Sequence, residues 1–346
     1  MIRFECDYAE GVHQKILENM MRTNLEQTAG YSEDVYSDHA RELIRQACGK
    51  EDLDVHFLVG GTQTNLTVIA SVLRPHQGVL CAVSGHVNVH ETGAIEATGH
   101  KVLAMPSTDG KITAEQVQEA YDAHWCDESR EHVVQPGMVY ISQPTENGTL
   151  YSKAELTALR ETCLKCGLPL YVDGARLGYG MAAPTNDVTL KDLAELSDIF
   201  YIGGTKVGAL FGEAVVISNP AYRQDFRYII KQRGGMLAKG RLLGIQFETL
   251  FTDGLYFEIS KHAVDLAMKI RKACEEKGFA MQYESYTNQQ FPILPNELVV
   301  ELRKKYAFYT WQKVDEDHTS VRFCTSWATD AENVEQLLAD IRTFDA

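Results

Sequence analysis

Short apolar runs alternate with longer amphipathic segments from about residue 55 to 217. Seven apolar runs, each followed by turn residues, lie at 55–61, 78–85, 100–106, 137–144, 168–174, 197–204 and 214–219. The segments between them repeat apolar positions with the period of a helix, at 64–73, 113–124, 153–165 and 189–196. This alternation predicts an α/β unit, with a mostly parallel seven-stranded sheet between crossover helices. Ligands of such sheets bind beyond the carboxyl ends of the strands.

The pattern changes on either side of this unit. Residues 1–50 hold one helical pattern, at 9–24, and a polar loop that we assign to substrate or dimer contacts. After residue 221, long helical patterns are followed by short strand patterns and a final helix, which predicts a smaller C-terminal α+β domain. The predicted division is therefore 1–50, a large ligand-binding domain at 51–245, and the small domain at 246–346.

Charge and composition exclude several classes of protein. The formal net charge of −15 opposes binding to nucleic acid or an anionic membrane, because both need a basic surface. No run approaches the roughly 18 apolar residues of a membrane span, and the first residues lack the apolar core of a signal peptide. The eight cysteines are scattered as in reduced proteins, so we expect a cytoplasmic location. Cys163 and Cys166 lack a second ligand pair, which favours helix packing over zinc, and no metal site is predicted.

Two strand ends carry residues suited to a planar anionic ligand. Gly60, Gly61, Thr62 and Asn65 follow the first apolar run and begin a helix, where bare amides and hydroxyls form a phosphate cup. An ordinary turn with a helix cap is the alternative. His86 follows the second run and could lay its ring over a planar ligand or move a proton. A histidine satisfied within its own loop is the alternative there.

Two further strand ends carry an acid and a lysine. Asp173 ends a buried strand, where a carboxylate is costly unless a cation or an N–H faces it. A protonated pyridine nitrogen is one such partner, and an ion pair with Arg176 that fixes a turn is the other. Lys206 follows the next strand among glycines and apolar residues, either extending to water or held as the free amine that a Schiff base needs. One crossover separates the two strands, so the acid and the lysine share one sheet edge.

Together these are the parts of a pyridoxal 5′-phosphate site: a phosphate cup, a stacking histidine, an acid for a pyridine nitrogen and a lysine. With these residues the chain resembles the threonine aldolase family, aspartate-aminotransferase-like enzymes of fold type I, and within it the phenylserine aldolase and low-specificity threonine aldolase branch. The matching segments are YSED, FLVGGTQTN, SGHVNVHETGA, YVDGARLGYG, GGTKVGAL, KQRGGMLAKGR and VRFCTSWATDAENV. They span nearly the whole chain.

The resemblance implies a role for each matching residue. Lys206 would form the Schiff base with the cofactor, and Asp173 would pair with the ring nitrogen. Arg176 would contact the ring hydroxyl or the substrate carboxylate, and Arg322 would hold that carboxylate bidentately. His86 would stack on the ring. The residues implied at the phosphate are Gly60, Gly61, Thr62, Asn65 and Thr205.

Other matches concern the substrate and the assembly. His132 matches a family histidine near the substrate side chain. Tyr31 lies in a loop that the resemblance assigns to the partner subunit, in a homodimer or homotetramer with shared active sites. Cys6 stands before Asp7 where most members have serine as a carboxylate contact. Lys239 stands in a run that has lost the usual family arginine, and would supply the charge near the phosphate or the substrate.

The reaction implied by the resemblance is retro-aldol cleavage of a β-hydroxy-α-amino acid of the threonine, allo-threonine or phenylserine type, giving glycine and an aldehyde. The base that takes the hydroxyl proton is His86, His132 or a bound water. A β-eliminating lyase would use the same Lys206 and Asp173 and is the nearest alternative. A non-catalytic binding protein that keeps only the cup is a second. A nucleotide-binding Rossmann protein is disfavoured, because no GxGxxG follows the first strand.

Overall fold

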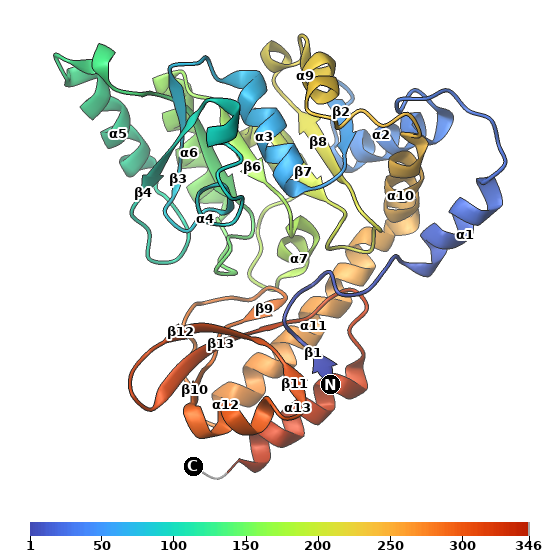
Figure 1. Ribbon diagram of the computed structural model, residues 1–346, viewed down its shortest axis with the longest axis vertical. Helices are drawn as coiled ribbons and strands as arrows, with labels where there is room; N and C mark the ends of the chain where they lie inside the picture. The colour runs from blue at the N-terminus through green and yellow to red at the C-terminus, as the bar shows by residue number, and fades with distance from the viewer. Residues whose placement is uncertain (345–346) are drawn as a thin grey trace.

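The computed structural model describes residues 1–344 of the chain. Figure 1 shows a large α/β part above a smaller part, with the long helix α11 (Leu255–Glu276) running from one into the other. The first strand, β1 (Ile2–Arg3), and the last helix, α13 (Ala331–Thr343), both lie in the smaller part (Figure 1). Among the described residues, no helix has the length and apolar character needed to cross a membrane.

The predicted seven-stranded sheet is confirmed, and each apolar run of the sequence is one of its strands. The strands are β2 (Asp54–Leu58), β3 (Gln77–Ala82), β4 (Lys101–Met105), β5 (Gln135–Ser142), β6 (Leu170–Asp173), β7 (Ile199–Gly203) and β8 (Glu213–Ile217). Their order is β2-β8-β7-β6-β5-β3-β4, and β8 alone runs antiparallel to its neighbours. The central strands are buried on both faces, which explains why their sequences are continuously apolar.

Helices cover both faces of this sheet. One face packs against α2 (Val35–Cys48), α5 (Ala114–Cys126), α6 (Lys153–Cys166), α8 (Leu190–Leu196) and α10 (Arg241–Phe251). The other packs against α3 (Gly61–Val72), α4 (His86–Val89) and α9 (Phe226–Gln232). Thr113, Ser152 and Thr189 start α5, α6 and α8 with capping boxes. Cys163 and Cys166 are both buried in the packed face of α6.

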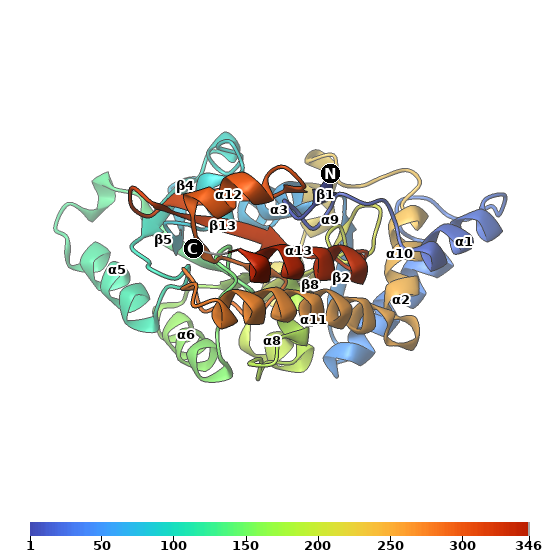
Figure 2. The same ribbon diagram turned by 90° about the horizontal axis from the view of Figure 1, so that it is seen from below.

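The smaller part is α+β, as predicted. In it β13 (His318–Cys324) lies between β10 (Ile293–Pro295) and β12 (Tyr309–Lys313), and also pairs with β9 (Gln289–Gln290). Helices α11, α12 (Asn296–Leu302) and α13 (Ala331–Thr343) share one apolar cluster with this sheet, and Figure 2 shows them from below. The short helix α7 (Leu177–Ala182) packs on α11, which brings the smaller part against the carboxyl ends of the large sheet.

The N-terminal segment is divided between the two parts. Strand β1 (Ile2–Arg3) pairs with β11 (Tyr306–Ala307), and Phe4 joins the apolar cluster of the smaller part. Helix α1 (Gln14–Thr23) begins later than the pattern at 9–24 indicates, because the His13 side chain caps it by accepting the Lys15 backbone N–H. The division at 1–50, 51–245 and 246–346 stays a prediction.

Candidate functional site

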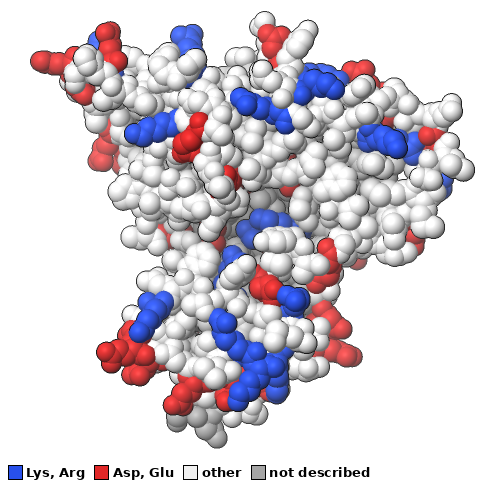
Figure 3. Space-filling model, in the orientation of Figure 1, with Lys and Arg blue, Asp and Glu red and all other residues white. Residues whose placement is uncertain are grey.

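A cavity of about 820 Å³ lies at the carboxyl ends of β5, β6 and β7, and residues of β12 and β13 line its other side. In Figure 3 this face is hollowed between the two parts of the molecule, and Lys or Arg atoms lie in the hollow. The site therefore forms where the parallel-sheet rule places it. Eight residues predicted from the sequence line the cavity: Gly61, Thr62, His86, Asp173, Arg176, Thr205, Lys206 and Arg322.

Lys206 and Asp173 share this cavity because they follow and end the neighbouring parallel strands β7 and β6. The backbone N–H groups of Gly204 and Thr205 both donate to the Gly212 carbonyl oxygen at 3.0 Å, which fixes the turn carrying Lys206. Burial, together with the charge of nearby Arg176, lowers the pKa of Lys206. Its amine is therefore more readily present in the uncharged, nucleophilic form.

Four hydrogen bonds hold the Asp173 carboxylate. The Tyr140 hydroxyl and Asn65 Nδ2 lie 2.6 Å and 3.0 Å from Oδ2, and the Tyr201 hydroxyl and Ala175 backbone nitrogen lie 2.6 Å and 2.9 Å from Oδ1. All four groups donate, so the arrangement suits an anion whose direction is fixed. The two tyrosines lie on strands to either side of β6, and neither was predicted as part of the site.

Asn65 does not line the cavity, although the sequence predicts it at the phosphate. Its side chain is fully buried, and its Nδ2 donates to Glu91 Oε1 at 2.7 Å as well as to Asp173. Its Oδ1 accepts from the Tyr171 hydroxyl at 2.8 Å. The reason is helical phase: residue 65 lies one turn into α3, behind Asp173, whereas the first residues of the helix line the cavity. Asn65 therefore positions the acid.

The start of α3 suits an anion. Gly60 is the N-cap of α3 and has no side chain to accept a hydrogen bond. The first backbone N–H groups of the helix therefore lack a capping acceptor. Gly61 and Thr62 line the cavity there, and Thr205 lines it from the turn after β7. A Cβ atom on Gly61 would lie 3.3 Å from the Tyr201 hydroxyl, so glycine keeps the approach open. Free amides and the helix dipole together favour a phosphate group.

Arg176 is paired with an acid from the start of the chain. Its Nε lies 2.6 Å from Asp7 Oδ2 and its Nη2 3.2 Å from Oδ1, and Asn288 Nδ2 donates to the same carboxylate at 2.9 Å. Burial opposes ionisation of Asp7, but the charges of Arg176 and Lys206 outweigh it and lower its pKa to about 2. Neither Cys6 nor Asp7 lines the cavity, and Asp7 acts on it through its contact with Arg176, so the substrate contact predicted for Cys6 stays a prediction.

Arg322 enters the cavity from β13 of the smaller part. Its guanidinium carbon lies 4.9 Å from the Tyr309 ring centroid and 5.6 Å from that of Trp311, and its Nη2 donates to the Glu5 carbonyl at 2.9 Å. Its Nε is buried without a hydrogen-bond partner among residues 1–344. A desolvated guanidinium that retains a free donor is suited to a carboxylate ligand.

His86 begins α4 and is oriented by an acid. Its Nδ1 lies 2.8 Å from Glu91 Oε1, and the Glu91 side chain is fully buried. The same carboxylate oxygen accepts from Asn65, so His86 and Asp173 are linked through one buried network. Because the ring is already fixed, packing a planar ligand against it would cost little further side-chain conformational entropy.

Two buried glutamates at the cavity were not predicted from the sequence. Glu213 on β8 is 3% exposed and accepts the Gly204 backbone N–H at 3.0 Å, and burial raises its pKa to about 8. Glu146 accepts the Ser142 hydroxyl at 2.8 Å and the His86 backbone N–H at 2.9 Å, and burial raises its pKa as well. Their only sequence signal is an acid within two residues of an apolar run.

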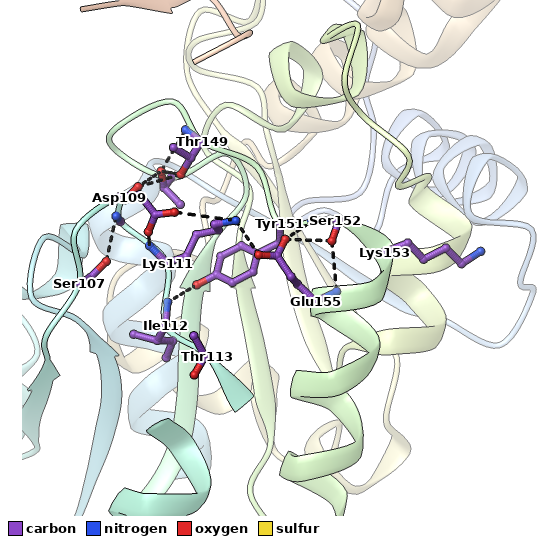
Figure 4. Close-up of polar contacts among 12 residues, drawn as sticks. Ser107, Asp109, Lys111, Ile112, Thr113, Thr149, Tyr151, Ser152, Lys153 and Glu155 are labelled. Atoms are coloured by element: carbon purple, nitrogen blue, oxygen red, sulfur yellow. Dashed lines mark hydrogen bonds and ion pairs between the residues drawn. The ribbon is translucent and has the colours of Figure 1, made fainter. Parts of the chain in front are cut away.

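A polar cluster outside the cavity holds the segment that follows β5 and carries one of these glutamates. Figure 4 shows its contacts with the loop before α5. The Thr149 hydroxyl donates to the Asp109 carbonyl oxygen at 2.8 Å, and Lys111 Nζ lies 2.6 Å from Glu155 Oε1 in the first turn of α6. These contacts anchor the segment to the loop before α5.

Three predicted residues lie outside the cavity of their own chain. His132 ends the exposed turn Arg130–His132 before β5, at the opposite end of the strand from the cavity. Lys239 is exposed just before α10, and Tyr31 is 44% exposed with Lys231 Nζ 4.8 Å from its ring centroid. His132 and Lys239 therefore do not line the cavity of their own chain, and their predicted roles stay predictions. Only a neighbouring subunit could bring these residues to a cavity, as the sequence predicts for Tyr31.

Comparisons of sequence agree with the chemistry of this cavity. Residues 5–296 match the family model described as beta-eliminating lyase. A low specificity L-threonine aldolase of Pseudomonas sp. (strain NCIMB 10558) is 29% identical, over 98% of this chain and 97% of its own. The enzyme of the same description from Saccharomyces cerevisiae is 28% identical, over 79% of this chain and 70% of its own.

Solved structures give a closer relative. A threonine aldolase of Leishmania major superposes with a TM-score of 0.95, at 43% sequence identity and with 99% of each chain covered. A double mutant of the aspartate aminotransferase of Thermus thermophilus superposes with a TM-score of 0.71, covering 99% of this chain and 91% of its own. Its sequence identity of 13% means that this second likeness shows the fold alone.

Proposed function

We propose that this chain, which belongs to the beta-eliminating lyase family and within it to the threonine aldolases, cleaves β-hydroxy-α-amino acids of the threonine type to glycine and an aldehyde. The observation that carries this proposal is the pairing of Lys206 and Asp173 on adjacent parallel strands of one cavity, with the pKa of the lysine lowered. The cofactor is pyridoxal 5′-phosphate, and a small amino acid is the substrate.

The residues of the cavity fit that cofactor. Lys206 would bind it covalently, Asp173 would hold the proton of its ring nitrogen, and the uncapped start of α3 would take the phosphate through Gly61 and Thr62. His86 would lie against the ring. When bound, pyridoxal 5′-phosphate supplies a conjugated ring that takes up the electron pair left on the α-carbon when a bond to that carbon breaks.

The chain's own groups orient the substrate and move its protons. Arg322, with its free Nε and its two aromatic neighbours, would bind the substrate carboxylate. Asp173, whose carboxylate accepts four hydrogen bonds, would face the ring nitrogen of the bound cofactor. The Lys206 amine would also be placed to carry a proton to or from the substrate α-carbon.

The visible spectrum of the purified protein tests the cofactor assignment. Reduction with borohydride should remove the absorption band of the bound cofactor, and peptide mass mapping should place the reduced adduct on Lys206. An adduct on another lysine, or none, would contradict the assignment.

A β-eliminating reaction remains a second candidate, because the family whose model matches carries that description and would use the same lysine and acid. The two reactions break different bonds, so their products separate them. Threonine or phenylserine should yield glycine with the matching aldehyde. Ammonia and a keto acid from serine or cysteine analogues, without any glycine from threonine, would establish the lyase instead.

We further propose a homodimer or homotetramer in which neighbouring chains complete each site. Tyr31, His132 and Lys239 are exposed and lie away from their own cavity, so they are available to another chain. A fully active monomer in sedimentation experiments would contradict this arrangement. The free cysteines and the net charge of −15 support a cytoplasmic enzyme without nucleic-acid or membrane partners, which cell fractionation tests.

A further inference from the structure

His90 is a second histidine of the cavity, and none of the roles given above uses it. It follows α4 directly, lines the cavity and is exposed at its opening. Its ring centroid lies 5.7 Å from that of His86, with an angle of 54° between the two rings. The two histidines therefore enter the site from one short helix, one at each end.

The surroundings of the two rings differ. His86 Nδ1 is held by Glu91 Oε1 at 2.8 Å, whereas neither ring nitrogen of His90 has a hydrogen-bond partner among residues 1–344. A ring that stacks on a planar ligand presents its face, while the lone pair that accepts a proton lies in the ring plane. A stacked and anchored His86 is therefore poorly directed to act as a base on the substrate side chain.

The charges around His90 favour its neutral form. Burial is the main cause that lowers its pKa, followed by its neighbour His86 and by three cations on the other elements around the cavity, which are Arg322, Arg176 and Lys206. Each of these causes disfavours the charged ring. At neutral pH the ring is therefore uncharged and has a free lone pair, which a general base requires.

We propose that His90 is the base that takes the proton of the substrate β-hydroxyl group, an inference that rests on the retro-aldol function proposed above. The O–H bond breaks as its proton passes to a ring nitrogen of His90. The electron pair of the O–H bond forms the aldehyde C=O bond as the Cα–Cβ bond breaks. The electron pair of the Cα–Cβ bond stays on the α-carbon, where bound pyridoxal 5′-phosphate would delocalise it. A proton added at the α-carbon then gives glycine, and His90 returns its proton to water at the opening.

The test compares the holoenzyme with its His90→Asn variant in two reactions. Cleavage of phenylserine needs the hydroxyl proton to leave, whereas exchange of the glycine α-hydrogen with deuterium from the solvent uses only the lysine and the cofactor. We expect His90→Asn to lower kcat for cleavage by about 100-fold or more, the contribution typical of a positioned base. Exchange into glycine, followed by NMR, should stay within a few-fold of wild type.

The pH profile provides a second readout. In wild type, kcat/KM for cleavage should rise with pH through a midpoint below the ordinary histidine value of 6.5, and this limb should be absent in His90→Asn. The exposed His76 lies outside the cavity, so His76→Asn is the matched control and should keep both reactions and the limb.

Three outcomes would overturn the inference. His90→Asn could cleave phenylserine within about threefold of wild type, it could keep the acid limb, or it could lose exchange and cleavage together, which would indicate a structural role. If wild-type enzyme exchanges the glycine hydrogen but cleaves no β-hydroxy amino acid, the proposed function itself fails, and the inference fails with it.

Discussion

The buried pair of Asp7 and Arg176 allows a quantitative prediction about stability. Asp7 is fully buried and its carboxylate meets Arg176 at 2.6 Å and 3.2 Å. Its pKa falls from 3.8 to about 2, and a change of that size corresponds to about 2.4 kcal/mol in favour of the ionised acid. Asp7→Asn would in addition leave the Arg176 guanidinium buried without its counter-charge. Breaking a buried pair in this way typically costs about 3–5 kcal/mol.

Urea unfolding of the full chain, followed by circular dichroism, measures this cost. We expect Asp7→Asn to lower the free energy of unfolding at pH 7 by at least about 2 kcal/mol. Asp52, which pairs with Arg223 and is 79% exposed, is the matched control, and Asp52→Asn should leave stability close to wild type because water screens the pair. A loss below about 1 kcal/mol for Asp7→Asn would refute the reasoning.

The dependence on pH checks the cause. The folded-state pKa of Asp7 is lowered, so its contribution is fully present above the unfolded value of 3.8 and is lost as the pH falls towards about 2. The difference in unfolding free energy between wild type and Asp7→Asn should therefore shrink between about pH 4 and pH 2. A difference that stays constant over this range would show that packing, rather than charge, produces the effect.

Three further predictions address the acids and the arginine of the cavity. The pKa of Glu213 is raised from 4.5 to about 8, so the free energy of unfolding of wild type should fall as the pH rises between these two values. Glu213→Gln should lack this fall. If urea unfolding shows the same change for both proteins between pH 5 and pH 8, the prediction is contradicted. Arg322→Lys should raise KM for the amino acid about tenfold or more, with a smaller change in kcat, because lysine cannot bind a carboxylate bidentately; an unchanged KM in initial-rate kinetics would argue against Arg322 as that contact. Asn65→Ala removes a donor to Asp173 and should weaken cofactor binding by about tenfold in a spectroscopic titration, the equivalent of one hydrogen bond to a charged group; unchanged binding would limit Asn65 to a structural role.

The sheet and its ligand edge were predictable because parallel strands buried on both faces have continuous apolar sequences. Each apolar run ends in turn residues at the edge where ligands bind. For this reason the sequence alone places Lys206 and Asp173 in the same site. The resemblance to a family added Arg322, which enters from the smaller part and which no local pattern places near the lysine.

Other parts of the site depend on orientation and on long-range contacts. The phosphate-cup motif includes Asn65, but helical phase turns its side chain away from the cavity and towards Asp173. Cys6 and Asp7 are adjacent, and only the folded contact with Arg176 shows that Asp7 holds a residue of the cavity. His132 matches a family motif, yet it precedes β5 and lies at the far end of that strand, which sequence similarity does not reveal.

The most direct test of the central claim is an NMR measurement of the products formed from threonine and phenylserine by the cofactor-loaded enzyme, with Lys206→Ala as the control. We predict glycine in equal amount to acetaldehyde or benzaldehyde with wild type, and neither product with Lys206→Ala. Ammonia and a keto acid in place of glycine, or equal cleavage by the variant, would contradict an aldolase that works through Lys206.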